Sequence, residues 1–207
     1  MAKKTTPTFA HTFELKTEKY QEDLIEKRFN AGRRLYNLML KEALKRQKKF
    51  REYPHYKKFI KQKSYKELNQ IKTLVGFTEY AFHSYITYLR QPFNKLIDSN
   101  TAQKIASRVW KAISEYQYGK KGKPRFKKKG RLRSLEGKAN STGIRFIDNK
   151  LLWGKIKIEV RLRENDEVEE YALTKKVKYC RVLKKEIRGK QRYYIQTILE
   201  GAPLIKK

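Results

Sequence analysis

Residues 119–133 read GKKGKPRFKKKGRLR, and this basic stretch divides the chain into two parts with different apolar spacing. Nine of its fifteen residues are Lys or Arg, and none is acidic. Its glycines and Pro124 exclude a single regular helix. A loop with this much like charge repels itself, so we expect it to be matched by a polyanion that neutralises it.

Before this loop, the apolar spacing predicts one strand followed by helices. Residues 9–16 alternate between apolar and smaller or polar side chains, which indicates a strand with one buried face. Residues 17–118 carry apolar side chains at three- and four-residue steps, which is typical of amphipathic helices. Ser64 with Glu67, and Asn100 with Gln103, have the spacing of a capping box.

After the loop, the apolar period changes to two. Residues 155–163, KIKIEVRLR, alternate strictly and give the clearest strand pattern in the chain. Asp148-Asn149 and Arg188-Gly189-Lys190 are turn signals between strands. The acidic residues 164–170 are interpreted as a solvated turn that points away from any polyanion.

These patterns predict an α+β fold. We expect a helical bundle inserted after the first strand of a small antiparallel β-barrel of the oligonucleotide-binding type. The predicted organisation is a first strand at 9–16, a helical domain at 17–118, a basic linker loop at 119–142, a β domain at 143–200 and a tail at 201–207.

The composition favours a nucleic-acid partner. The chain has 207 residues, with 52 Lys and Arg against 21 Asp and Glu, for a formal net charge of +31. An acidic membrane is the weaker alternative, because no apolar run approaches the length that spans a bilayer and no signal peptide is recognised. The single Cys180 excludes an internal disulfide and a Cys-based zinc site. We therefore expect a cytoplasmic protein, because a reducing compartment fits this cysteine usage.

No pattern of catalytic residues is recognised. Phosphodiester cleavage assisted by metal ions needs converging carboxylates, and Glu159 stands alone on its predicted strand. His11, His55 and His83 are scattered along the chain. We therefore expect no catalytic residue, no metal site and no cofactor in this chain, although a nuclease site that the sequence hides is left open as a third hypothesis.

Two sets of residues are candidates for nucleic-acid contact. The first would bind phosphates or stack on RNA bases; its members are Arg28, Arg33, Arg34, Lys120, Lys121, Lys123, Arg125, Phe126, Lys127, Lys128, Lys129, Arg131 and Arg133. For the three helix arginines, solvated flank charge is an equal alternative. The second set would read bases by hydrogen bonding; it comprises Asn69, Asn100, Gln103, Asn140 and Ser141. For Asn100 and Gln103 the alternative is helix capping, which is at least as strong an interpretation for Asn100. Aromatic residues within the basic regions could stack on bases, namely Phe126, Tyr65, Trp110, Tyr116 and Tyr118. For any one of them, a place in the core is the more common role.

The chain resembles TnpB, the OrfB-type protein of bacterial insertion sequences. The likeness rests on RFNAGRRLYNLMLKEAL, in which Arg34, Tyr36, Asn37 and Leu40 match the family's helix core, with Leu35 as a departure. The loop GKPRFKKKG and the later strands IRFIDNKLLWGKIKIEVRLR follow in the family's order. The family is related to type V CRISPR effectors, and its full-length members are RNA-guided DNA endonucleases used in transposition.

The resemblance implies a wedge domain interrupted by a helical recognition domain, which together hold a guide RNA and read a short motif in duplex DNA. It also implies a bacterial protein associated with the nucleoid. By this likeness Tyr65, Asn69, Asn100 and Gln103 would face the motif, with Asn140 and Ser141 as a further contact region. The family's RuvC-like nuclease motif, Gly-x-Asp-x-Gly, and its zinc ribbon are not found in this sequence. We therefore expect the recognition half without the nuclease, and Mg²⁺ would belong to that nuclease.

Several alternatives stay open at this point. The chain can be a truncated gene, a decayed element or a natural short form, and a separate nuclease chain or a second copy can be its protein partner. A structural RNA-binding protein of ribosomal type is the alternative function, because such a protein also uses excess positive charge to bind RNA.

Overall fold

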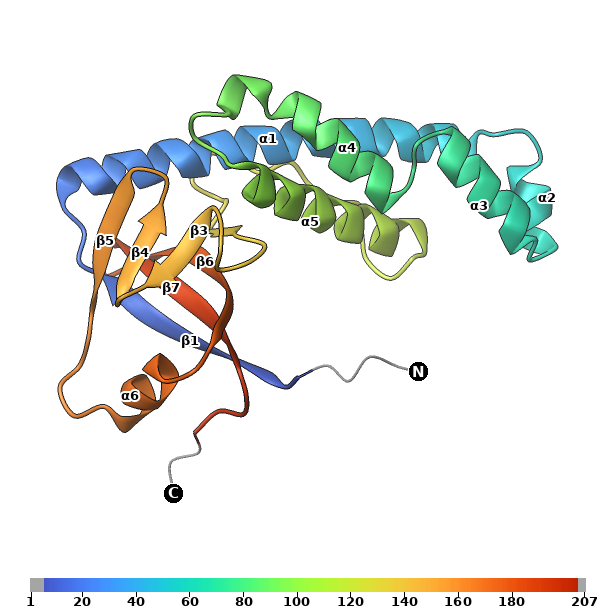
Figure 1. Ribbon diagram of the computed structural model, residues 1–207. Coiled ribbons are helices and arrows are strands. Elements are labelled where there is room, and N and C mark those ends of the chain that lie inside the picture. The colour runs from blue at the N-terminus through green and yellow to red at the C-terminus, as the bar shows by residue number, and fades with distance from the viewer. Residues whose placement is uncertain (1–5, 205–207) are drawn as a thin grey trace. The chain divides into compact units, whose positions relative to one another are not determined.

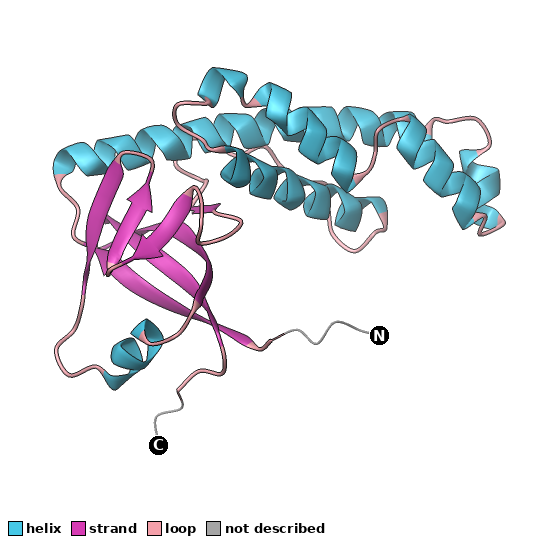
Figure 2. Cartoon of the chain, in the orientation of Figure 1, coloured by secondary structure: helices cyan, strands magenta, loops and turns pink. Residues whose placement is uncertain are grey.

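The computed structural model describes residues 6–204 and shows an α+β fold (Figures 1 and 2). The expected tail at 201–207 falls partly outside these residues. The elements in chain order are β1 (Thr8–Leu15), α1 (Lys19–Arg51), α2 (Tyr56–Lys61), α3 (Tyr65–Leu74), α4 (Glu79–Leu89), the 3₁₀ turn η1 (Gln91–Phe93), α5 (Ser99–Gln117), β2 (Ser134–Glu136), β3 (Ile144–Ile147), β4 (Lys150–Trp153), β5 (Ile156–Arg161), α6 (Glu167–Leu173), β6 (Val177–Ile187) and β7 (Lys190–Glu200).

The chain forms two compact units. The β unit consists of the described parts of Met1–Phe29 and Leu132–Lys207, and the helical unit is Asn30–Arg131. Helix α1 therefore begins in the β unit and ends in the helical unit.

The β unit is built on one seven-stranded antiparallel sheet with the order β2-β6-β7-β1-β5-β4-β3. The sheet curls into a half-barrel (Figure 1). Strand β1 lies in its middle, where Phe13 faces Ile195 of β7 and Leu15 faces Val160 of β5. The predicted first strand is therefore confirmed as part of the later sheet.

Alternation along the strands produces the core of the β unit. Ile156, Ile158 and Val160 of β5 are buried, while the residues between them are exposed. The ring of Phe13 stacks on that of Phe146, with centroids 5.2 Å apart. The buried face is thus the face that the period-two pattern predicted.

Both predicted hairpin turns are present. Asp148 and Asn149 have φ of 48° and 57°, and Arg188 and Gly189 have φ of 50° and 74°. Positive φ at both central residues is the type I′ geometry that matches the twist of paired strands. Each turn joins neighbouring strands, β3 to β4 and β6 to β7.

Two local predictions are wrong in the β unit. The expected linker at 119–142 contains β2, which pairs with β6 through the buried Leu135. The acidic residues 164–170 are not a simple solvated turn, because α6 begins within them at Glu167 and Glu169 is only 3% exposed. A short strand and a short helix each carry too few residues for a periodic signal.

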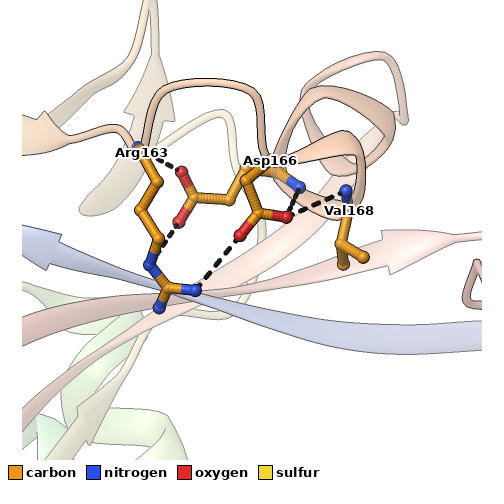
Figure 3. Close-up of polar contacts among 4 residues, drawn as sticks. Arg163, Asp166 and Val168 are labelled. Atoms are coloured by element: carbon orange, nitrogen blue, oxygen red, sulfur yellow. Dashed lines mark hydrogen bonds and ion pairs between the residues drawn. The ribbon is translucent and has the colours of Figure 1, made fainter. Parts of the chain in front are cut away.

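The side chain of Asp166 explains the start of α6. Its Oδ1 accepts hydrogen bonds from the backbone N–H groups of Val168 and Glu169, while Oδ2 accepts from Nη1 of Arg163 at 3.1 Å (Figure 3). The backbone N–H of Arg163 donates to Oε2 of Glu169 at 2.8 Å. This N-cap and the acidic first turn suit the positive end of the helix dipole.

The helical unit buries only part of the apolar stripes that the spacing predicted, because Leu38 of α1 and Tyr65 and Leu74 of α3 are exposed. Leu35, Met39 and Ala43 of α1 are fully buried. The Trp110 ring of α5 lies against Phe77 and Phe82, at 5.3 and 5.4 Å between centroids. Trp110 therefore belongs to an aromatic core, which was the alternative to stacking on bases.

Both predicted capping boxes are wrong. The side chain of Ser64 makes no capping hydrogen bond at α3. Helix α5 begins earlier than expected, with Asp98 as its N-cap: Oδ1 accepts from the N–H of Thr101 at 2.9 Å. Asn100 therefore lies inside α5 and is not its cap. Asp98 is also a preferred N-cap residue, and its carboxylate carries a charge that the helix dipole favours.

Candidate nucleic-acid interface

The basic loop, defined as residues 119–131, is attached near its middle to the central part of α1. The N–H of Lys127 donates to Oδ1 of Asn37 at 2.8 Å, and Nδ2 of Asn37 donates to the carbonyl of Lys127 at 3.0 Å. One asparagine amide thus satisfies both backbone groups of one loop residue, as a neighbouring strand would do.

Two further α1 side chains, those of Arg33 and Tyr36, lie close to Lys127. Nη1 of Arg33 lies 3.5 Å from the carbonyl of Lys127, at the long limit for a hydrogen bond. Nζ of Lys127 lies 5.7 Å from the ring centroid of the buried Tyr36, within cation–π range. Burial raises the pKa of the Tyr36 hydroxyl, so the ring stays neutral beside the lysine.

The other cationic residues of the loop are directed to solvent. The exposed ones are Lys120, Lys121, Lys123, Arg125, Lys128, Lys129 and Arg131. Nζ of Lys121 pairs with Oε2 of Glu115 at 2.8 Å, and this bond lowers the pKa of the Glu115 carboxyl. The ring of Phe126 is 53% exposed among these cations. An exposed aromatic between cationic side chains is the arrangement that stacks on bases while phosphates are neutralised.

The three predicted arginines of α1 lie in different environments. Arg34 is exposed, with its guanidinium 5.3 Å from the ring of Phe93. Arg33 is half-buried, and its Nε has no hydrogen-bond partner among the described residues. Neither residue lies on the buried stripe of α1, so phosphate contact stays a prediction for both.

Arg28 belongs to the interior of the β unit. It is only 9% exposed, and its guanidinium carbon lies 4.4 Å from the centroid of the Trp153 ring. A Cβ atom on Gly154 would lie only 2.9 Å from Nη2 of Arg28, so the guanidinium packs closely against this glycine. The solvated-flank interpretation is therefore wrong for Arg28. Arg133 also belongs to this unit, where it is exposed and its carbonyl accepts from the N–H of Lys184.

The predicted base-reading residues fall into three local groups. Tyr65 and Asn69 are exposed on α3, one helical turn apart, and Tyr65 is 68% exposed. Asn69 accepts from Nζ of Lys72 at 3.2 Å and lines a shallow cavity of about 590 Å³. Asn100 and Gln103 are half-buried on α5.

The third group, Asn140 and Ser141, lies in the β unit. The amide of Asn140 donates to the carbonyl of Phe146 at 3.0 Å and accepts from the N–H of Phe146 at 2.7 Å. Sγ of Cys180 lies 3.4 Å from the same oxygen of Asn140. These contacts give Asn140 a structural role at the end of β3, whereas Ser141 is exposed.

Comparison with known proteins gives only low similarity to solved structures. No protein-family model and no curated protein sequence matches this chain. A similar solved chain is Cas12f1, from a cryo-EM structure of the Cas12f1-sgRNA-target DNA complex. The identity is 12% and the TM-score 0.33, over 98% of this chain and 60% of that one. This chain thus spans about 60% of the Cas12f1 chain, and a TM-score this low carries no functional argument.

Two contacts that sequence reasoning missed fix elements near the predicted site residues. Asn37 was visible only as part of a family pattern, although it follows Arg33 by one helical turn and faces the same direction. The second contact joins Lys184 of β6 to Glu26 of α1, with Nζ 2.8 and 2.9 Å from the two carboxylate oxygens. No local sequence pattern predicts a pair of residues so distant in the chain.

The β unit also contains a cavity of about 720 Å³ with mixed charge. Its cationic residues include Lys16, Lys157 and Arg161, but Glu14, Glu18, Glu22 and Glu159 line it as well. Glu159 pairs with Lys150 at 3.0 Å, which lowers the pKa of the Glu159 carboxyl. With four carboxylates in its wall, this cavity is a poorer site for phosphate than the basic loop.

Within residues 6–204, no cluster of three or more His, Cys, Asp or Glu side chains could hold a metal ion. Across the same residues, every helix falls short of the length and apolar character needed to cross a bilayer.

Proposed function

We propose that this protein binds nucleic acid and that the basic loop is its main contact with the sugar-phosphate backbone. The observation that carries the proposal is the loop itself, which carries seven exposed Lys and Arg side chains and an exposed phenylalanine on a segment attached to α1. Cationic side chains release condensed counterions when they neutralise phosphates, so this surface gives affinity with little sequence preference. The net charge of +31 adds long-range attraction.

The partner that we propose in more detail is a guide RNA together with a short motif in duplex DNA. In this proposal the chain is the recognition half of a TnpB-like transposon protein, with the curled sheet as a wedge and the helical unit inserted after β1. The succession of matching motifs along the sequence supports it. The exposed pair Tyr65 and Asn69, on one face of α3, supports a role in reading the motif.

Binding as a function of salt tests the general proposal. The full chain is titrated against poly(U) RNA, single-stranded DNA and duplex DNA over a series of salt concentrations. Contact with about eight phosphates of a duplex predicts that log K falls with a slope near −7 against log salt. Absence of binding to all three at modest ionic strength would refute the proposal.

Recovery of the bound RNA tests the detailed proposal. Sequencing of RNA that copurifies with the chain should yield one discrete species. A mixture of ribosomal fragments would instead support the structural RNA-binding alternative.

A library of duplexes with a randomised segment then tests motif reading. We expect Asn69→Ala to relax the preference at one position, by about 1–3 kcal/mol for a bidentate contact. Asn94→Ala, at another exposed asparagine of the helical unit, is the matched control and should leave the preference unchanged. Equal selection by both variants would contradict the role of Asn69.

A further inference from the structure

We infer that Asn37 is the positioning residue of the basic loop: its amide holds Lys127 so that the cations on both sides are already arranged for a phosphate chain. The inference rests on the proposed function, because it assigns how the loop is prepared for binding. It concerns a residue of α1 that need not touch the nucleic acid.

The chemistry of the contact suits this role. An asparagine amide offers one acceptor and two donors and carries no charge. A carboxylate at this position would accept but could not donate, and a lysine would donate but could not accept. Asn37 uses both functions on the backbone of Lys127, at 2.8 and 3.0 Å, and so leaves the lysine side chain free of the anchor.

A second contact in the same loop shows the contrast. The N–H groups of Lys120 and Lys121 donate to the carbonyl of Glu115, and Nζ of Lys121 also pairs with the Glu115 carboxylate at 2.8 Å, so this contact neutralises one cation of the loop. The anchor at Lys127 fixes the loop without cancelling positive charge. A binding surface for a polyanion gains from this arrangement, since the anchor itself neutralises none of the cations that could contact a phosphate.

The anchor also opposes the self-repulsion of the loop. Like charges in a flexible segment extend it, and a loop that is disordered before binding must be ordered during binding at an entropic cost. Two backbone hydrogen bonds at the middle of the loop remove much of that cost beforehand. Loss of the anchor should therefore weaken binding without removing any phosphate contact.

The experiment compares variants of the full chain in binding to poly(U) RNA across salt concentrations. Asn37→Ala should raise Kd about tenfold, which corresponds to about 1.4 kcal/mol, with an unchanged salt slope. The double variant Lys128→Ala, Lys129→Ala should also raise Kd, but with a slope shallower by about 1.4, since each lost single-strand contact contributes about 0.7.

Asn30→Ala is the matched control. Asn30 lies on the same helix, and its side chain makes no hydrogen bond with any residue that the structure describes. It should bind as the unmodified protein does, with the same slope. A tenfold loss in Asn30→Ala as well would show a general effect on α1 and would overturn the inference.

Amide hydrogen exchange at Lys127 provides a readout that does not depend on RNA. Exchange should become faster in Asn37→Ala, while the thermal midpoint and the exchange of α5 amides stay unchanged. Asn37→Asp keeps the acceptor for the Lys127 N–H but loses the donor to the Lys127 carbonyl, so exchange should be slower than in Asn37→Ala and faster than in the unmodified protein. Unchanged exchange in Asn37→Ala would overturn the inference.

The outcomes separate the two proposals. If the unmodified protein binds no nucleic acid, the proposed function fails, whereas the exchange data still test the anchor. If the unmodified protein binds and Asn37→Ala binds equally well, the proposed function stands and the positioning role fails. A shallower salt slope in Asn37→Ala would also refute the role, because it would report lost phosphate contacts.

Discussion

Lys184 and Glu26 are 158 positions apart in the chain, yet Nζ of Lys184 donates to both carboxylate oxygens of Glu26 at 2.8 and 2.9 Å. The same Nζ lies 4.9 Å from the ring of Phe29, and the hydroxyl of Tyr193 donates to Glu26 at 3.1 Å. The lysine side chain is 6% exposed, whereas that of the glutamate is 35% exposed. This contact fastens the first turns of α1 to β6 and β7.

Removal of the two charges should have unequal effects on stability. Glu26→Gln leaves a buried ammonium without its counter-charge, so we expect the free energy of unfolding to fall by about 2–3 kcal/mol. Lys184→Met should lower it by only about 1 kcal/mol, because water can reach the remaining carboxylate and the methionine fills similar volume. Urea denaturation measures both. Glu52→Gln, in the exposed pair with Lys48, is the control and should change stability by less than about 0.5 kcal/mol. Equal losses from the two changes would contradict the burial argument.

Gly154 should be more sensitive to substitution than Gly189. Both have positive φ, 59° and 74°, so alanine strains the backbone by roughly 1 kcal/mol at each position. At Gly154 the new Cβ would also lie 2.9 Å from Nη2 of Arg28, which must then move off Trp153, whereas nothing lies within 4 Å at Gly189. We expect Gly154→Ala to lower the free energy of unfolding by about 1 kcal/mol more than Gly189→Ala does. Thermal or urea unfolding measures both variants. Identical costs would show that Arg28 moves freely.

Acidification should destabilise the β unit through His11. Burial lowers the pKa of His11 from 6.5, although the carboxylates of Glu169 and Asp166 oppose the shift. The unfolded chain therefore binds a proton at higher pH than the folded chain does. Stability is full above pH 6.5 and is lost as the pH falls from there to the folded-state pKa. The free energy of unfolding, measured against pH, should fall less in His11→Phe. His55→Asn, at an exposed histidine, should keep the slope of the unmodified protein.

Phe126 should contribute to RNA affinity without contributing to stability. Its ring is 53% exposed, so Phe126→Ala removes little buried apolar area. If the ring stacks on one base, the variant should lose about 1–3 kcal/mol of binding to poly(U), with an unchanged salt slope. Fluorescence anisotropy measures the affinity. Phe126→Tyr should retain it, and Tyr80→Ala, at a tyrosine that is 82% exposed, is the control. A loss of stability in Phe126→Ala would place the ring in the core instead.

Periodic segments of this chain could be predicted, and irregular contacts could not. The alternation of KIKIEVRLR specified β5 and its buried face, and the turn residues Asp148 and Asn149 specified the hairpin before it. Helix α6 was missed because seven residues are too few for a periodic signal, and its capping residue Asp166 stands within an acidic run. Local spacing also favoured Asn100 as a cap, although the carboxylate of Asp98 makes the hydrogen bond.

The candidate interface shows the same division. The charge and glycine content of the basic loop predicted an exposed, irregular segment, since both are local properties. Its attachment to Asn37 joins residues that are 90 positions apart in the chain, and composition alone does not predict which residue holds the loop. The burial of Arg28 depends in the same way on Trp153, which belongs to a strand made much later in the chain.

The central place of β1 has a consequence for the order of folding during synthesis. Its two neighbours in the sheet, β5 and β7, are translated only after the whole helical unit. The helices can fold while the ribosome still holds the remaining strands, whereas β1 must wait as a single extended segment with both edges unpaired. Pairings over such long separations slow folding, so the pairing of β1 with β5 and β7 should be a late and slow step.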